Sequence, residues 1–308
     1  MANMVTRVIC LGISTLDKIW PVPDLPAGGG KYRASDYLEV GGGMAANAAV
    51  AAAKLGAGCA YWGRAGDDAA GATMQREMVA YGVDIANFRL FAGARSSISA
   101  VIVSQDGERM IVNYRGMGIP DDPAWLPLDQ VRQANAIHAD IRWVEGAAAI
   151  FAAARAAAIP TVLDGETATV EAFTAVLPWT DHAIFSEPGL RSFAGPDCLQ
   201  NEATRHAALA RVRELGCRVA AVTRGARGTL WLDEHGFHHL PSFAVDVVDT
   251  TGAGDVFHGA YALAIGEGQN VAQAMRFASA VAALKCTRQG GRAGIPDRTE
   301  VDAFLAGR

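Results

Sequence analysis

Short apolar runs rich in β-branched residues alternate with longer Ala-rich stretches along most of the chain. The short runs have the length of buried strands, and the Ala-rich stretches have the length of helices. The predicted strands cover residues 7–13, 59–63, 136–140, 161–164 and 219–223, and the predicted helices cover 45–55, 69–81, 146–158 and 204–215, with two long helices after Thr251. Repeated strand–helix–strand units predict an α/β fold with a mainly parallel sheet and helices on both faces.

Two stretches depart from this rhythm. In residues 19–40 and 96–114, an alternation of apolar and polar side chains, together with turn residues, predicts antiparallel strands. We expect them to form a small β lid, inserted at about residues 14–40 and 96–115, over the carboxyl ends of the parallel strands, where open α/β sheets bind ligands. The sequence contains no internal repeat, low-complexity tail or linker, so we expect one domain over residues 1–308.

Composition and charge narrow the class of protein. With 51% hydrophobic and 19% charged residues, the chain has the composition of a soluble globular protein. Its formal net charge of -5 argues against nucleic-acid binding, because neutralising phosphates requires a basic face. The five cysteines contain no Cys-x-x-Cys pair, which predicts reduced thiols and a cytoplasmic location. We also expect no signal peptide and no membrane segment, because every long apolar stretch is interrupted by charge.

The strongest candidate for chemistry is a glycine-rich turn that runs into an amphipathic helix, Asp249-Thr-Thr-Gly-Ala-Gly-Asp255. Gly252 and Gly254 let the backbone approach a ligand, and the first N–H groups of the helix present the positive end of its dipole. This suits a developing phosphoryl charge, and Asp255 is placed to accept a proton from an attacking hydroxyl. From the residues alone, a simple helix cap explains Asp255 equally well.

A second glycine cluster, Gly41-Gly-Gly-Met-Ala-Ala-Asn47, opens the Ala-rich helix that ends near Gly56. The glycines allow a ligand to approach the backbone, and the amide of Asn47 is suited to grip a hydroxyl. Taken alone, the cluster is explained better as a close-packed turn in which Asn47 bonds to local backbone.

Together, these two elements resemble the two signatures of the PfkB carbohydrate kinase family, from Gly42 to Gly56 and from Asp249 to Ala260. The resemblance implies a ribokinase-like three-layer αβα fold and an ATP-dependent transfer of phosphate to a sugar. It implies that Asp255 is the catalytic base. The implied anion hole is Gly252, Ala253 and Gly254, and the implied contacts to sugar hydroxyls are Asp17, Gly42, Gly43 and Asn47.

The segment Thr223-Arg-Gly225-Ala-Arg-Gly228 resembles the nucleotide phosphate contact of the same family. The same residues are also explained by a plain turn after a strand, with no ligand. The resemblance also implies that Thr251, with Gly252 and Gly254, contacts the nucleotide. It implies that the region of Ala282 to Cys286 and Gly290-Gly291 borders adenine and, in many relatives, a monovalent cation such as K⁺.

One position departs from the family pattern. Where many members have Asn-x-x-Glu near the magnesium and phosphate, this chain reads Ser186-Glu187-Pro-Gly. Glu187 then either acts on Mg²⁺ through water or is an ordinary surface carboxylate.

Within the family, stretches around Lys31, Asn113 and Arg142 are most similar to the sulfofructose kinases, which phosphorylate the 1-hydroxyl of 6-deoxy-6-sulfofructose. The resemblance implies an anionic ketose, whose sulfonate requires cationic and neutral donors such as these three side chains. Each of the three is also explicable as a surface or lid residue. The alternatives are a 6-phosphofructokinase or tagatose-6-phosphate kinase, a ketohexokinase, and a catalytically silent sugar or nucleoside sensor.

Two further expectations concern the surface. A β lid leaves a free sheet edge and an exposed face, so we expect a homodimer formed through it. The histidines of His235-Gly-Phe-His238-His239 predict an exposed hairpin rather than a metal site, because no Cys or carboxylate follows at ligand spacing. His258 lies one turn after Asp255 and is expected to pack inside the helix.

Overall fold

The computed structural model describes residues 5–105 and 108–308. Within this part of the chain, the strands form a nine-stranded sheet and a separate four-stranded sheet. The order in the large sheet is β13-β12-β11-β10-β9-β8-β1-β4-β5. The strands of this sheet are β1 (Arg7–Gly12), β4 (Gly58–Gly66), β5 (Phe88–Phe91), β8 (Ala136–Asp140), β9 (Thr161–Gly165), β10 (His182–Ser186), β11 (Val219–Thr223), β12 (Thr229–Asp233) and β13 (Gly236–Leu240).

The large sheet is mainly parallel, as the alternating pattern predicts. All strand pairs from β5 to β11 run parallel. At the other edge, β12 pairs antiparallel with β11 and with β13. The central strands are buried on both faces, which explains their continuous apolar sequences. The carboxyl ends of β1, β8, β9, β10 and β11 therefore lie along the same side of the sheet, where the functional loops begin.

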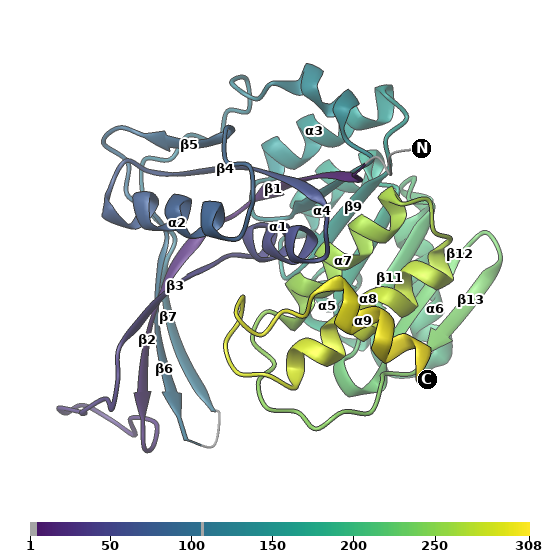
Figure 1. Cartoon of the computed structure of the whole chain (residues 1–308). Coiled ribbons are helices and arrows are strands. Elements are labelled where there is room, and N and C mark those ends of the chain that lie inside the picture. The colour runs from purple at the N-terminus through teal and green to yellow at the C-terminus, as the bar shows by residue number, and fades with distance from the viewer. Residues whose placement is uncertain (1–4, 106–107) are drawn as a thin grey trace.

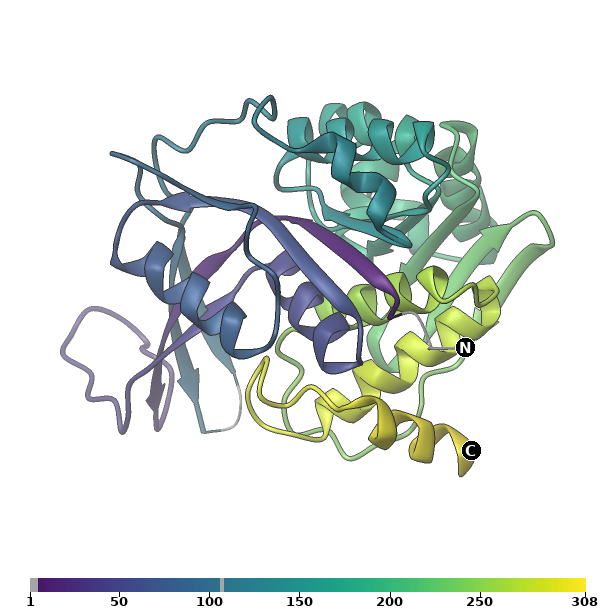
Figure 2. The ribbon, with the colours of Figure 1, turned by 45° about the horizontal axis from the view of Figure 1, so that its top comes forward.

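Helices cover both faces of this sheet (Figure 1) and complete the expected three layers. Figure 2 shows one group above the sheet and the other below it. One face carries α1 (Met44–Lys54), α2 (Ala69–Ala80), α7 (Ala253–Gly266), α8 (Val271–Cys286) and α9 (Arg298–Ala306). The opposite face carries α3 (Val144–Ala156), α4 (Val170–Val176), α5 (Glu187–Ala194) and α6 (Glu202–Glu214).

The packing of α1 against α7 is especially close because both helices present small residues. A Cβ added to Gly259 of α7 would lie 2.2 Å from the carbonyl oxygen of Ala48 in α1. The alanines of α1 are buried at this contact. Because the two backbones nearly touch, the first turn of α1, which carries Asn47, lies next to the first turn of α7, which carries Asp255.

The four-stranded sheet is the predicted lid, and it projects away from the body at the lower left of Figure 1. Its order is β3-β2-β6-β7, with strands β2 (Thr15–Val22), β3 (Leu38–Gly42), β6 (Ile98–Ser104) and β7 (Arg109–Tyr114). The outer pairs are antiparallel as expected, but the central pair of β2 and β6 is parallel. The expectation of purely antiparallel pairing was therefore wrong, because each of the two inserted segments forms its own hairpin and the hairpins then join side by side.

All five cysteines are free thiols. Among the residues that the structure describes, no helix has both the length and the apolar character needed to cross a bilayer.

Candidate active site

The predicted base, Asp255, lies in the first turn of α7. Gly252 precedes this helix with a left-handed backbone (φ 71°), which favours glycine and turns the chain sharply into the helix. The carboxylate Oδ2 of Asp255 accepts a hydrogen bond from Nδ2 of Asn47 at 2.7 Å. Burial, and secondarily the negative charge of Asp164, raise the pKa of Asp255 to about 7, against the lowering effect of the Asn47 bond. Such a carboxyl group is poised to exchange a proton near neutral pH.

The turn before Asp255 leaves space for a ligand. A Cβ added to Gly254 would meet no atom within 4 Å, so the backbone of this residue faces an open volume. The first N–H groups of a helix have no partner within the helix, and they carry its partial positive charge. The predicted anion hole at Gly252, Ala253 and Gly254 therefore has the geometry of a phosphate cradle.

The predicted sugar side of the site is assembled by close approach of glycines. A Cβ on Gly42 would lie 2.2 Å from Oδ2 of Asp17, and Gly43 has a left-handed backbone with a Cβ position 2.5 Å from the carbonyl oxygen of Ile13. Only glycine fits these two positions without displacement of the lid or the end of β1. Asp17, Gly42, Gly43 and Asn47 thus meet where the lid joins the body, as the sequence predicts.

Asp17 and Asn113 belong to one polar row across the lid. The register pairs Asp17 with Ser99 and Ser99 with Asn113 on three neighbouring strands. Nδ2 of Asn113 donates to Oγ of Ser99 at 3.1 Å, and Ser99 in turn hydrogen-bonds Asp17. Burial raises the pKa of Asp17, while the Ser99 bond and the charge of Arg292 lower it. Ser99 is a member of this row that the sequence pattern did not identify.

Arg142 lies at the carboxyl end of β8, beside a cavity of about 400 Å³. The cavity is also lined by Arg64, Arg115, and Asp121, which forms an ion pair with Arg64. The backbone N–H of Arg142 donates to Oδ1 of Asp140, and its guanidinium donates to the carbonyl oxygen of Thr167 at 2.8 Å. The cavity lining thus contains three arginines and one aspartate, an excess of positive charge that suits an anionic group.

Asp140 ties this cavity to the rest of the site. Its Oδ2 accepts hydrogen bonds from the backbone N–H groups of Ile13 at 2.8 Å and Ala45 at 3.1 Å. One buried carboxylate thereby joins the end of β1, the start of α1 and the loop of Arg142. Burial raises the pKa of Asp140, and these backbone bonds oppose that rise. The sequence placed Asp140 at a strand end, in the stretch around Arg142, but did not assign it to the site.

The predicted nucleotide turn follows β11. Thr223 ends this strand beside Ser186 of β10, and its hydroxyl donates to the carbonyl oxygen of Phe185 at 3.3 Å. Gly225 and Gly228 both have left-handed backbones, and a Cβ on Gly228 would lie 2.0 Å from the carbonyl oxygen of Leu240. The turn is therefore compact and open to a ligand at the carboxyl edge of the sheet.

Comparison with known proteins decides the family. The model of the pfkB family carbohydrate kinases matches residues 5–298. The chain belongs to this family. Ribokinase of Bacillus subtilis (strain 168) is 30% identical over 304 residues, covering 97% of this chain and 100% of that protein. Fructokinase-1 of Oryza sativa subsp. japonica is 28% identical over 327 residues, covering 98% of each.

Solved structures show the same fold. A protein of Agrobacterium tumefaciens superposes with a TM-score of 0.92 at 33% identity, covering 98% of each chain. The ribokinase of Arabidopsis thaliana, solved with ribose and ATP, gives a TM-score of 0.83 at 25% identity, covering 98% of this chain and 99% of that one. The protein is therefore a carbohydrate kinase with the ribokinase-like fold, and a silent sensor is not supported.

Within this kinase, Glu187 occupies the position predicted to act on magnesium. Its carboxylate forms ion pairs with Arg224 at 3.6 Å and with Arg227. Among the described residues, no group of three or more His, Cys, Asp or Glu side chains is arranged to hold a metal. Mg²⁺ usually binds through substrate phosphates, waters and one or two carboxylates, so such a group is not required. Both carboxylate oxygens of Glu187 are engaged by arginines, so they do not fit direct ligation of Mg²⁺.

The remaining predicted site residues are Lys31, Ala282 and Cys286. Lys31 is exposed in the loop between β2 and β3, away from the strand ends that carry the other residues. Ala282 and Cys286 lie one turn apart on α8, and the carbonyl oxygen of Cys286 accepts from the backbone N–H groups of Val248 and Asp249. Cys286 thus holds the chain that leads into the phosphate cradle.

Two buried polar residues lie next to the site in positions that the sequence did not assign to it. Arg292 is only 4% exposed; its Nε donates to Oδ1 of Asn47 at 2.8 Å, and its guanidinium lies 3.4 Å from Glu77. His258, expected only to pack, is indeed buried, and its ring lies 2.8 Å from the carbonyl oxygen of Gly254 and 3.4 Å from Asp164. Contacts of this kind join residues far apart in sequence, so no local pattern identifies them.

Proposed function

We propose that this kinase transfers the terminal phosphate of ATP to the 1-hydroxyl of 6-deoxy-6-sulfofructose, giving 6-deoxy-6-sulfofructose 1-phosphate. The observation that carries the proposal is the cavity of Arg64, Arg115 and Arg142, which provides more positive than negative charge beside the sugar side of the site. A sulfonate is a permanent anion and requires such donors. Arg142 supplies a planar fork and Asn113 a neutral donor from the lid, whereas Lys31 lies in the exposed loop between β2 and β3 and does not line this cavity.

The reaction follows from the geometry around Asp255. Asp17, Gly42, Gly43 and Asn47 orient the sugar, so that its hydroxyl lies beside Asp255. Asp255 accepts the hydroxyl proton as the oxygen attacks the terminal phosphate of ATP, and the cradle of Gly252, Ala253 and Gly254 stabilises the charge on the transferred group. Thr223, Gly225, Gly228, Thr251, Ala282 and Cys286 border the nucleotide in this proposal. Bound Mg²⁺ neutralises phosphate charge, and Glu187 is its proposed contact through water.

Two alternative acceptors remain within the same chemistry. A sugar phosphate would satisfy much the same donors as a sulfonate, and the arginine-lined cavity favours it equally. A neutral sugar is the acceptor suggested by the names of the ribokinase and fructokinase relatives. A neutral sugar has no charged group to bind the arginines of this cavity.

A coupled measurement of ADP release separates these acceptors. The panel is 6-deoxy-6-sulfofructose, fructose 6-phosphate, tagatose 6-phosphate, fructose and ribose. We expect kcat/KM for the sulfonate to exceed each of the others by at least about tenfold. A higher kcat/KM for either phosphate ester, or for a neutral sugar, would replace the proposed acceptor.

Replacement of Arg142 by alanine tests the proposed anion contact directly. We expect KM for the anionic sugar to rise by roughly 10- to 100-fold, with KM for ATP unchanged, because in this proposal the remaining guanidinium donors of Arg142 bind the sulfonate and not the nucleotide. Arg155→Ala is the matched control, since Arg155 is a surface arginine of α3 that also donates to a backbone carbonyl, that of Pro178. An unchanged sugar KM in Arg142→Ala would remove Arg142 from the site.

A homodimer through the lid belongs to the same proposal. β7 is an edge strand of the lid and exposes the large apolar side chains of Met110, Ile111, Val112 and Tyr114. Exposed apolar surface on a sheet edge favours association with a second copy. A monomeric mass in sedimentation equilibrium would reject the dimer. The cytoplasmic location stays a prediction from the sequence.

A further inference from the structure

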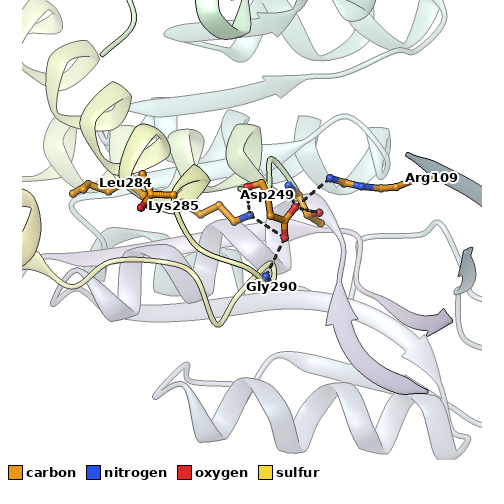
Figure 3. A network of polar contacts seen from close by, with 7 residues as sticks. Arg109, Asp249, Leu284, Lys285 and Gly290 are labelled. Atoms are coloured by element: carbon orange, nitrogen blue, oxygen red, sulfur yellow. Dashed lines mark hydrogen bonds and ion pairs between the residues drawn. The ribbon is translucent and has the colours of Figure 1, made fainter. Parts of the chain in front are cut away.

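A buried lysine ends α8 directly behind the phosphate cradle. Lys285 is 0% exposed, and its ammonium group points at Asp249, the first residue of the glycine-rich turn (Figure 3). Nζ donates to the carbonyl oxygen of Asp249 at 2.8 Å and lies 3.6 Å from its Oδ2. A buried ammonium is costly unless it is paired: burial lowers the pKa of Lys285, and the charge and hydrogen bond of Asp249 oppose that fall.

The carboxylate of Asp249 is fully engaged by the surrounding chain. Its Oδ1 accepts from the backbone N–H and the hydroxyl of Thr251 and from Arg109 at 3.1 Å, and its Oδ2 accepts from the backbone N–H of Gly290 at 3.0 Å. Burial by itself would raise the pKa of Asp249, but the Thr251 bonds and the charges of Lys285 and Arg109 together lower it. Asp249 is therefore an ionised carboxylate with two cationic partners.

This arrangement does not fit a diffusible monovalent cation. The family resemblance predicts such an ion near residues 282–286 and 290–291, the segments that contribute Lys285 and Gly290. Here the ammonium already occupies the position between the carbonyl oxygen and the carboxylate of Asp249. A second cation at that position would meet a like charge at close range in a poorly solvated region.

We propose that Lys285 is the built-in cation of the phosphate cradle and that the kinase therefore needs no K⁺ or other monovalent ion. Its ammonium joins the end of α8 to the start of the turn, where the backbone N–H of Asp249 also donates to the carbonyl oxygen of Cys286. Its charge offsets that of Asp249, which otherwise would repel the phosphates bound a few residues further on. Lys285 is a positioning residue, because it acts on the cradle through Asp249.

The unmodified kinase gives the first test. Activity is measured in buffers whose only monovalent cation is tetramethylammonium, with ionic strength held at about 0.15 M, and K⁺ or Na⁺ is then substituted for it. We expect kcat and KM for ATP to change by less than about twofold. Activation by K⁺ of about tenfold or more would overturn the proposal.

A lysine replacement gives the second test. In Lys285→Met, whose side chain has similar length and no charge, we expect kcat/KM for ATP to fall by at least about tenfold in tetramethylammonium buffer. Ammonium or K⁺, which are small enough to enter the vacated space, should restore a large part of it, whereas tetramethylammonium should not. A folded Lys285→Met kinase with full activity, or one that no small cation rescues, would contradict the proposal.

Lys54→Met is the matched control. Lys54 lies in the last turn of α1 and donates to the backbone carbonyls of Arg292 and Ala293 at 3.4 Å, neither of which belongs to the glycine-rich turn 249–255. We expect its activity to show no dependence on small cations. If Lys285→Met does not fold, the test on the unmodified kinase still decides the proposal.

The inference rests on the kinase activity but not on the identity of the sugar. Titration calorimetry of ATP binding without sugar should show the same pattern as activity: no effect of K⁺ on the unmodified kinase, and tighter binding by Lys285→Met when K⁺ or ammonium is added. A failed sulfofructose assignment would leave this pattern intact, whereas K⁺-dependent ATP binding by the unmodified kinase would overturn only the present inference.

Discussion

Asn47 donates a hydrogen bond from Nδ2 to Oδ2 of Asp255 at 2.7 Å, although 208 residues separate them in the chain. The bond exists because α1 and α7 pack backbone to backbone at Gly259 and Ala48. It joins the two glycine-rich signatures, one from each end of the sequence, into a single site. The five predictions that follow depend on this site.

Replacement of Asp255 by asparagine removes the proposed base while keeping its size. We expect kcat to fall by roughly 10²- to 10⁴-fold, because a positioned base contributes an effect of that size. Circular dichroism and ATP binding should show a folded protein that retains its nucleotide. Turnover at the wild-type rate would refute the role of Asp255.

The same replacement should stabilise the protein above neutral pH. Folding raises the pKa of Asp255 from an ordinary 3.8 to about 7, so between these values the folded state binds more protons than the unfolded state. Stability therefore falls as pH rises through this window, and the penalty is complete above pH 7. In Asp255→Asn we expect a higher Tm at pH 8, by about 1–2 °C per kcal/mol recovered, and no gain at pH 4. An equal change in Tm at both pH values would show that the charge is not its cause.

The pH profile of catalysis should report the same carboxyl group. Because a base acts only when ionised, kcat/KM of the free kinase should rise with pH and level off above an apparent pKa of about 7. In Asn47→Leu, the hydrogen bond that lowers the pKa of Asp255 is lost, so the rise should move to higher pH. A shift to lower pH would contradict the assigned contact. Since Asn47 is also a proposed sugar contact, the position of the rise, and not the size of kcat/KM, is the relevant measurement.

Arg292 positions Asn47 and should be needed for both activity and stability. Its Nε donates to Oδ1 of Asn47, which orients the amide so that Nδ2 faces Asp255. In Arg292→Met we expect a loss of up to about 3 kcal/mol in the free energy of unfolding, because Glu77 is left partly buried beside an uncharged side chain. The apparent pKa in kcat/KM should also rise, which a purely structural role would not produce. Urea unfolding and the pH profile measure the two effects separately.

The two glycines of the cradle should respond differently to alanine. Gly254 faces open space and has an ordinary helical position, so Gly254→Ala should leave Tm unchanged or slightly higher. Its methyl group would occupy the cradle, and we expect kcat/KM for ATP to fall by about tenfold or more. Gly252 has a left-handed backbone, and Gly252→Ala should lower stability by about 1 kcal/mol as well. Full activity in Gly254→Ala would show that phosphate does not bind at this turn.

Much of the fold follows from local patterns. The alternation of β-branched runs and Ala-rich stretches predicted β1, β4, β8, β9 and β11 and the helices α1, α2, α3 and α6, and the structure confirms a mainly parallel sheet. The glycine-rich turn before Asp255 was also predicted from the sequence, because φ angles and helix starts depend on a few neighbouring residues.

Long-range packing decided the rest. The parallel pairing of β2 with β6, the bond between Asn47 and Asp255, and the contact of Lys285 with Asp249 each join segments distant in sequence. The raised pKa of Asp255 depends on burial and on Asp164, which approaches it only in the folded chain. Strand periodicity and turn chemistry are properties of neighbouring residues, so the sequence alone determined the elements and the base. The surroundings that set the charge of that base depend on which helices and strands pack together, and only the tertiary structure decided them.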